Sequence, residues 1–453
     1  MCMKRIIVNN FRCYRQKEIE FRPGVNLLIG DNSSGKTSLI RACNFVSNAF
    51  FCGYSDENTV WRSVENDDFR FVLGENNTIL PWMPVSIDFT LSETDFLPIH
   101  KQDGSEVALN IKEDKRYKLQ KNSPKNNRNL VTGLFAFKEY CSELYAYSHI
   151  DDDGSIHQLN ALPVYACFTT EDIHSSRKIN RENFMKYNQK PSFGYNECYD
   201  CRGLFDYWLT RLLVLQEAET GELEINTVRK ALHLALGPEG CNIIDDIVLR
   251  PMRGKVYFRY VDGRVVESSM LSDGYKRLVN IVLDIAIRCA LLNKDMYGDE
   301  SYLHTHGTVI IDEIDEHLHP ALQGRILKDL HRTFPKMQFI VSTHAPKVIS
   351  SVETNADNVV YRLWYDKDTD KYEHEEVNAY GLDANLILEG SMGVDARDTE
   401  VLDLLNTVQS LVGNRRLDEA KEKITQLEAL TQPDQPVLIK IRSIINRLES
   451  RNR

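Results

Sequence analysis

The sequence predicts an α/β fold with a largely parallel sheet, followed by a small helical module. Three short apolar runs predict the parallel sheet, because buried parallel strands have continuous apolar composition. They are Val25–Ile29, Thr308–Ile311 and Gln338–Ser342. Helix starts follow the first and third runs, and three segments near the C-terminal end have helical spacing.

The elements follow in order along the chain. Residues 4–9 and 17–21 predict a hairpin, and residues 37–48 a helix. An irregular inserted lobe is expected at about 50–160, and a mainly helical subdomain at about 195–300. The helices expected there are 202–237 and 271–292, with strands at 247–260 between them. A hairpin at 359–377 closes the part that we call the head, residues 1–377, and the tail is residues 378–453.

Composition sets limits on the class of protein. A chain of 453 residues exceeds what one core usually supports, so two or three compact units are expected. A formal charge of −11 argues against a surface that holds DNA by bulk electrostatics. Ten scattered cysteines, no apolar run near ~18 residues and no signal-peptide core together predict a cytoplasmic protein with no membrane contact.

Residues 30–37, Gly-Asp-Asn-Ser-Ser-Gly-Lys-Thr, match the spacing of a phosphate-binding P-loop. A turn between strand and helix points backbone N–H groups at a phosphate, and the helix N-terminus adds partial positive charge. We expect Lys36 to bridge the β- and γ-phosphates of ATP and the Thr37 hydroxyl to bind Mg²⁺. The residues expected to contact the nucleotide here are Asn32, Ser33, Ser34, Gly35, Lys36, Thr37 and Ser38.

Two acids follow the strand Thr308–Ile311. At the carboxyl edge of a parallel sheet they would lie beside the P-loop, where ligands bind in such folds. Asp312 is then expected to hold Mg²⁺, and Glu313 to orient the attacking water as the catalytic base. Further along, His344 follows the third strand and is expected to hydrogen-bond the γ-phosphate or that water.

A second anion site is predicted at Ser272, Asp273 and Gly274, where a serine-glycine turn begins a helix. A capped helix start would explain this turn if it stood alone. One nucleotide cannot easily contact two helix starts of one compact subunit. We therefore expect two subunits that pair head to tail, each closing its serine turn over the nucleotide of the other.

The full set of elements resembles the ABC-type P-loop ATPases of the RecF/SMC/OLD-like branch. Segment 271–275 is similar to the signature of that family, 311–313 to its Walker B strand and 342–344 to its switch histidine. Asp315–Pro320 is similar to its D-loop, which favours a structural reading of His317 and His319. The resemblance implies that Phe11 and Arg12 lie near the adenine and the α-phosphate. The glutamine of the Q-loop has no evident counterpart.

The tail adds a narrower resemblance. From Asn378 onward the chain is similar to stand-alone defence ATPases, and most similar to the PtuA family of the Septu anti-phage system. That resemblance implies a separate HNH-type nuclease partner, PtuB. We expect a homo-oligomer built from the head-to-tail dimers, with nucleic acid bound through the complex. The AriA family of the PARIS system, whose partner is a Toprim nuclease, is a close second.

Three features leave alternatives open. The basic run of Lys115, Arg116, Lys118, Lys121 and Lys125 is either a solvated loop or a nucleic-acid patch, and the latter would suit a RecF-like DNA-binding repair ATPase. The apolar stripes of the tail helices at 397–412, 417–430 and 436–448 predict oligomer contacts, or else docking on the head. Cys198 and Cys201 have CxxC spacing but no second ligand pair nearby.

Overall fold

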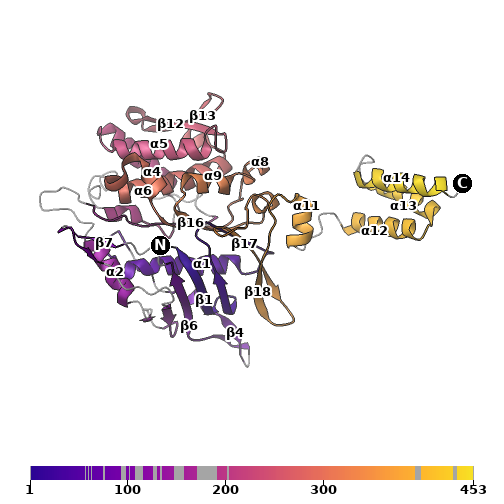
Figure 1. The fold of residues 1–453 in the computed structure, drawn as a ribbon, viewed down its shortest axis with the longest axis horizontal. Coiled ribbons are helices and arrows are strands. Elements are labelled where there is room, and N and C mark those ends of the chain that lie inside the picture. The colour runs from indigo at the N-terminus through magenta and orange to yellow at the C-terminus, as the bar shows by residue number, and fades with distance from the viewer. Residues whose placement is uncertain are drawn as a thin grey trace. The chain divides into compact units, whose positions relative to one another are not determined.

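The computed structural model describes residues 2–56, 58–59, 61–62, 64–74, 77–92, 98–101, 103–107, 116–125, 130–132, 135–146, 158–170, 191–200, 202, 204–392, 399–431 and 436–451. The chain forms two compact units, a head of Met1–Asp383 and a tail of Ala384–Arg453 (Figure 1). The head ends later than residue 377 because Ala379 is fully buried and the Gly381 amide donates to the Ser350 carbonyl at 3.0 Å. Within the described residues, no helix has both the length and the hydropathy needed to cross a bilayer.

The centre of the head is a six-stranded sheet whose first five strands are parallel. Its order is β11 (Val164–Phe168), β15 (Gly307–Ile311), β16 (Met337–Ser342), β3 (Val25–Ile29), β17 (Val359–Asp366) and β18 (Lys371–Glu376). The antiparallel pairing of β17 with β18 is the hairpin expected from the sequence. Because β16 lies between β3 and β15, the ends of these three strands meet at one edge of the sheet.

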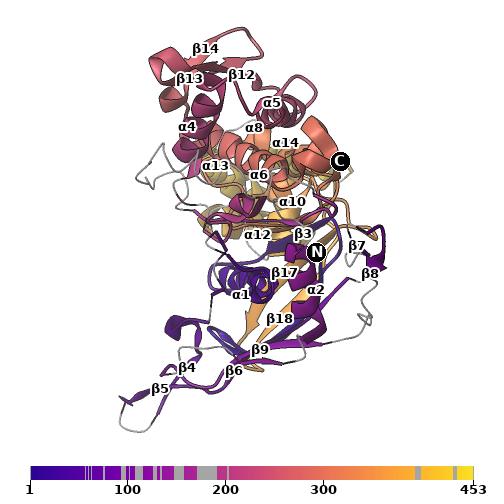
Figure 2. The same cartoon turned by 90° about the vertical axis from the view of Figure 1, so that its left-hand side faces the viewer.

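A second sheet is antiparallel and takes in part of the expected insertion. Its order is β10 (Leu130–Thr132), β9 (Tyr117–Lys121), β6 (Val85–Leu91), β1 (Met3–Phe11) and β2 (Tyr14–Glu20). The described part of region 50–160 is therefore joined to the rest of the head by strand pairing, since β6 pairs with β1 and helps to bury Ile6 and Val8. Helix α1 (Lys36–Asn48) packs against both sheets, and Figure 2 shows it on the side of the parallel sheet opposite α6 (Asp273–Tyr297).

The subdomain after residue 195 combines helices with a small sheet. Its elements are α4 (Leu204–Glu217), α5 (Glu222–Leu236), the antiparallel strands β12 (Ile244–Arg250), β13 (Lys255–Tyr260) and β14 (Val265–Glu267), and α6. The single helix expected at 202–237 is two helices. The chain breaks at Glu219 and Gly221, which have positive φ angles of 53° and 68°.

Shorter elements complete the head. They are the hairpins β4–β5 (Phe71–Leu73, Ile79–Pro81) and β7–β8 (Ile99–His100, Glu106–Val107), and helices α2 (Phe135–Ala146), α7 (Ser301–His304), α8 (Pro320–Gln323), α9 (Ile326–Thr333) and α10 (Pro346–Ile349).

The tail is a helical unit with a core of its own. After α11 (Ala384–Leu386) come α12 (Thr399–Gly413), α13 (Leu417–Leu430) and α14 (Pro436–Arg451). One buried cluster joins the three longer helices: Leu405, Val408, Ala420, Ile424, Leu427, Leu438, Ile441 and Ile445. Most of the apolar stripes are therefore buried among the helices themselves. Leu430, Ile439 and Ile444 remain exposed.

Candidate nucleotide site

The predicted P-loop connects β3 to α1, and its backbone requires glycine at two positions. Gly30 has φ 144°, and a Cβ atom there would lie 2.1 Å from the carbonyl oxygen of Leu363. Gly35 has φ 97°, and its Cβ would lie 2.4 Å from the phenol oxygen of Tyr14. Since neither position can hold a side chain, the sequence spacing of the two glycines follows from the close packing of this loop.

Lys36 begins α1 and lies folded back on the loop. Its ammonium donates to the carbonyl oxygens of Gly30 at 2.8 Å and Asp31 at 2.9 Å. Burial lowers the pKa of Lys36, and the nearby acids Asp312 and Glu313 partly oppose that shift. A longer hydrogen bond of 3.4 Å runs to the Ser34 hydroxyl. An almost buried cation held by neutral acceptors is suited to receive phosphate oxygens, which would restore the solvation it lacks.

The two predicted acids lie at the end of β15, and a serine from the neighbouring strand joins them. The Ser342 hydroxyl donates to the Asp312 carboxylate and accepts from the Glu313 amide at 2.8 Å. Ser342 ends β16, the strand that separates β15 from the P-loop strand. From the sequence, Ser342 was recognised only as part of the histidine-bearing segment. Its contact with the two acids depends on the pairing of β16 with β15, which the sequence does not show.

The histidine-bearing turn is tied to the loop after β15. The amide of His344 donates to the Asp315 carboxylate at 3.2 Å, and the Thr343 hydroxyl donates to the same carboxylate oxygen. The His344 side chain is partly exposed. The ends of β15 and β16 are therefore joined by side-chain hydrogen bonds as well as by strand pairing.

A cavity of about 470 Å³ brings several predicted site residues together. Thr37 and Asp312, the two expected magnesium ligands, both line it, and so does Arg12 from the turn between β1 and β2. No glutamine is among the described residues that line it. Thr169 and Thr170 follow β11, the parallel neighbour of β15, and occupy the wall beside Asp312.

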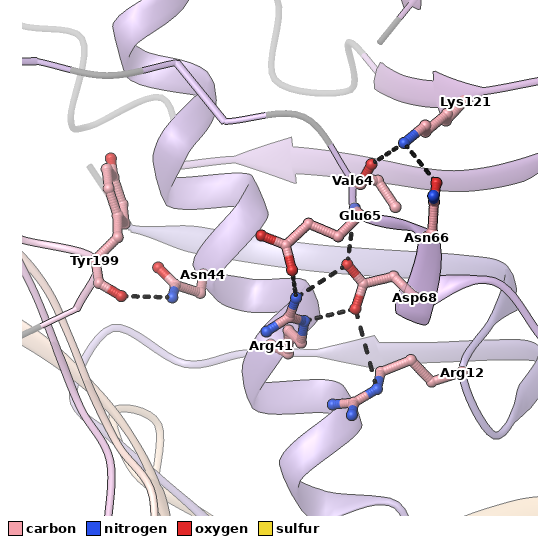
Figure 3. A network of polar contacts seen from close by, with 9 residues as sticks. All are labelled: Arg12, Arg41, Asn44, Val64, Glu65, Asn66, Asp68, Lys121 and Tyr199. Carbon is pink, nitrogen blue, oxygen red and sulfur yellow. Dashed lines mark hydrogen bonds and ion pairs between the residues drawn. The ribbon is translucent and has the colours of Figure 1, made fainter. Parts of the chain in front are cut away.

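An ion-pair network supports the arginines of this cavity (Figure 3). Arg41 on α1 contacts the fully buried Asp68 at 2.5 Å and Glu65 at 2.6 Å. The Arg12 side chain lies 4.0 Å from the same Asp68 carboxylate, and its amide donates to the Asp68 carbonyl. Asp68 therefore orients both guanidinium groups. Sequence reasoning missed Arg41 and Asp68, because neither lies in a recognisable motif.

Phe11 precedes Arg12 but lies in the core. Its ring is fully buried and meets Phe45 of α1 edge-on, with ring centroids 6.3 Å apart. In this conformation the ring supports the turn that presents Arg12. An adenine contact by Phe11 remains a prediction.

The serine-glycine turn lies outside this cavity. Ser272 occupies the N-cap position of α6 without a side-chain capping hydrogen bond. Ser272 and Asp273 are both exposed, and neither is among the residues that line the cavity. Gly274 is buried, and a Cβ there would lie 2.3 Å from the carbonyl oxygen of His317. The glycine thus allows the start of α6 to pack against the loop after Glu313.

A family model described as "AAA domain, putative AbiEii toxin, Type IV TA system" matches residues 25–350, well over half of the chain. The protein belongs to this AAA-domain family. The match runs from the P-loop strand through the histidine-bearing turn, so the family region contains all the elements gathered at the sheet edge. The α/β P-loop fold class expected from the sequence is thereby confirmed.

Curated relatives narrow the resemblance. A Retron Vc95 probable ATPase of Vibrio cholerae is 36% identical over 36% of this chain and 31% of its own length. A Retron Ec83 probable ATPase of Escherichia coli is 31% identical over 38% of this chain and 31% of its own length. Septu protein PtuA of Bacillus thuringiensis is 26% identical over 42% of this chain and 46% of its own length. The resemblance to PtuA-like defence ATPases is confirmed, and the matched region spans less than half of each relative.

Solved structures give broader coverage at lower similarity. An SMC head bound to the C-terminal winged-helix domain of ScpA matches 83% of this chain and 98% of that chain, at 17% identity and a TM-score of 0.48. A RecF structure matches 80% of this chain and 95% of that chain, at 16% identity and a TM-score of 0.38.

The remaining sequence features have structural roles where they are described. Lys121 of the basic run is buried in β9, and its ammonium donates to the Val64 carbonyl at 2.6 Å. Lys118 lies opposite Asp88 in the same sheet. The run is therefore partly a strand rather than a loop, and Lys115 lies outside the described residues.

The sequence offered two possible metal positions, one at His317 and His319 and one at Cys198 and Cys201. The His319 side chain caps α8 by accepting from the Ala321 amide, and His317 lies 3.6 Å from Glu316. Among the residues that the structure describes, no group of three His, Cys, Asp or Glu could hold a metal ion. Cys198 is buried, whereas Cys201 lies outside the described part of the chain.

Proposed function

We propose that this protein is an ATP-hydrolysing sensor and scaffold subunit of a bacterial anti-phage defence complex. Two heads would pair head to tail around two ATP molecules, and the paired heads would assemble with and regulate a separate nuclease. The similarity to the retron and Septu proteins supports the defence role, and the description of the two retron proteins as probable ATPases supports the reaction.

One observation carries the hydrolytic part of this proposal. The P-loop and the two acids lie at the ends of strands separated only by β16, and Ser342 on that strand hydrogen-bonds both acids. A phosphate cradle with a water-orienting carboxylate beside it is the arrangement that phosphoryl transfer to water requires.

Each residue then has a definite task. Lys36 would exchange its loop carbonyls for phosphate oxygens, and Thr37 and Asp312 supply the hydroxyl and carboxylate ligands that Mg²⁺ prefers. When bound, Mg²⁺ would neutralise charge on the phosphates. Glu313, one residue beyond Asp312, would orient the attacking water. Arg12 and Arg41 would line the rest of the nucleotide pocket, which is large enough at about 470 Å³ for the nucleoside part.

The pairing of two heads is supported by the position of Ser272. An exposed helix start with a free hydroxyl cap, outside the cavity of its own subunit, is available to the nucleotide of a second copy. The alternative DNA-binding function relied on the basic run. The support for it is weaker because the Lys121 ammonium of that run is hydrogen-bonded to the Val64 carbonyl.

Removal of the Lys36 ammonium tests the nucleotide site directly. We expect Lys36→Ala to abolish ATP binding in isothermal calorimetry, because the cradle loses the only buried cation that the described part of the loop contains. Lys347→Ala, an exposed lysine on the short helix after His344, is the control and should bind normally. Full-affinity binding by Lys36→Ala would contradict the assignment.

The partner is tested separately. The wild-type protein, purified from cells that express its neighbouring genes, should co-purify with a nuclease, and the Lys36→Ala variant should do so less. If the wild-type protein carries no nuclease and binds duplex DNA tightly and salt-sensitively by itself, the repair function is favoured instead.

A further inference from the structure

Arg277 lies on α6, five residues after Ser272, and its guanidinium is buried at the edge of the parallel sheet. It is 2% exposed. One terminal nitrogen donates to the carbonyl oxygens of Asp312 at 2.8 Å and Glu313 at 3.0 Å. The other donates to the Glu316 carboxylate at 2.8 Å and to the Thr169 carbonyl at 3.5 Å. One side chain therefore joins the start of α6 to the ends of both β15 and β11.

The main chain that Arg277 holds is in an unusual conformation. Glu313 has φ 51°, a left-handed angle that non-glycine residues adopt only when their surroundings enforce it. Its amide is bound by the Ser342 hydroxyl and its carbonyl by Arg277. These two contacts come from different elements, β16 and α6, and together they fix where the Glu313 side chain emerges.

We propose that Arg277 is a positioning residue, which sets the orientation of Glu313 and ties it to the serine turn at the start of α6. The proposal rests on the ATP hydrolysis proposed above. The connection to Ser272 depends on Gly274, which packs against the His317 carbonyl. This packing leaves α6 no room to shift independently of the loop. A displacement of Ser272 would therefore change the backbone that carries Glu313, the proposed catalytic base.

The chemistry of arginine suits this task. A planar fork can bind two carbonyl oxygens with one nitrogen and a carboxylate with the other, whereas a lysine ammonium provides one compact donor group. Arg277→Lys retains the charge and loses this geometry. We expect the turnover number to fall by at least about tenfold, as small misplacements of a reacting group commonly cause, with the KM for ATP changed by less than about twofold.

The control is a second arginine that also donates to two main-chain carbonyls and contacts a carboxylate, but at an exposed position. Arg332 on α9 donates to the carbonyls of Glu239 and Leu234 and contacts Asp329, away from the strand ends. Arg332→Lys should leave both kinetic constants unchanged. Rates are to be expressed per nucleotide-binding site, so that a purely structural defect would lower the active fraction and not the turnover of each site.

A double variant separates positioning from stability. If Arg277 acts through Glu313, then Arg277→Lys should change the residual turnover of Glu313→Gln by less than about twofold, since the effects of residues acting as one unit do not add. Effects that multiply fully, or an Arg277→Lys enzyme with wild-type turnover, would overturn the proposal.

A milder variant covers the case in which Arg277→Lys does not fold. Glu316→Gln removes one charged partner of Arg277 at a partly exposed position. It should lower the turnover number by about threefold at constant KM, and an unchanged turnover would equally overturn the proposal. The rate of ATP hydrolysis by the wild type tests the proposed function, whereas the ratio of variant to wild-type turnover tests the role of Arg277. A failure of the proposed function can therefore be distinguished from a failure of the Arg277 proposal.

Discussion

The adjacent residues Asp312 and Glu313 are held in different ways, and this difference supports the separate roles proposed for them. Asp312 lines the cavity and is almost buried, and its carboxylate is held by a hydrogen bond from Ser342. Glu313 is bound through its backbone, which leaves its partly exposed side chain to contact water. A fixed carboxylate suits metal binding, and a free one suits proton acceptance.

At the residue scale, Glu313→Gln should still bind ATP but hydrolyse it ~10²–10⁴-fold more slowly, because the amide cannot accept a proton from water. Phosphate release and nucleotide affinity, measured on the same sample, check this. Glu353→Gln, an exposed glutamate after α10, serves as the control. A Glu313→Gln protein with undiminished phosphate release would remove the catalytic role.

The sequence identified the residues proposed to contact the phosphates and Mg²⁺, but not the residues that position them. Lys36, Thr37 and Asp312 are recognisable because phosphate and magnesium demand these side chains at fixed spacing in the chain. Ser342, Arg277 and Asp68 act across strand or helix packing, each on a partner 27 or more residues away in the sequence. Such roles depend on tertiary neighbours and leave no local pattern.

At the scale of elements, the two sheets of the head are joined by a buried lysine. Lys17 on β2 donates to the Tyr372 carbonyl at 2.9 Å and lies 2.8 Å from the ring nitrogen of His374, both on β18. Burial lowers the pKa of Lys17 to about 8, although Glu373 partly opposes the shift. Burial and the Lys17 charge also lower the pKa of His374, so its neutral ring accepts from the ammonium.

This shift predicts how stability changes with pH. Between pH 8 and 10.5 the unfolded chain binds more protons at Lys17 than the folded chain, so this residue adds stability as pH rises through that window. The free energy of unfolding of the wild type, relative to Lys17→Met, should therefore increase from pH 7.5 to 10 in denaturant titrations. With Lys347→Met in place of Lys17→Met the difference should stay constant. A constant difference for Lys17→Met as well would contradict the shift.

The tail helices give a second prediction at this scale. Leu427 is 1% exposed in the tail core, and Leu430 on the same helix is 54% exposed. Leu427→Ala should destabilise the tail by about 2–5 kcal/mol, whereas Leu430→Ala should be close to neutral. Because the tail is a separate compact unit, ATP affinity of the head should not change in either variant. Denaturation followed in parallel with nucleotide binding checks both statements.

The helical pattern of the tail was predictable because apolar spacing is a local property. How completely its stripes are buried was not, since that depends on how three helices pack together. The stripes predicted oligomer contacts, and most of them face the tail's own core. The oligomer prediction for the tail now rests on the exposed Ile439, Ile444 and Leu430.

For the molecule as a whole, the proposed pairing of heads depends on Ser272. Ser272→Arg places a long cation where a neighbouring subunit's γ-phosphate pocket would close, and it should block the ATP-dependent increase in particle mass without weakening nucleotide binding. Mass photometry beside a binding titration makes the comparison, with Ser105→Arg on the hairpin β7–β8 as control. Normal mass growth in Ser272→Arg would exclude the serine turn from the interface.

Tyr14 gives the phosphate loop a mechanical connection to a distant hairpin. Its hydroxyl donates to the Gly35 carbonyl at 2.9 Å, and its ring meets Tyr372 edge-on at 5.2 Å between centroids. A Cβ atom at Gly35 would lie 2.4 Å from the phenol oxygen of Tyr14, so the backbone of the loop packs directly on this aromatic pair. A substitution of Tyr372 on β18 is therefore expected to affect the phosphate loop through the Tyr14 ring.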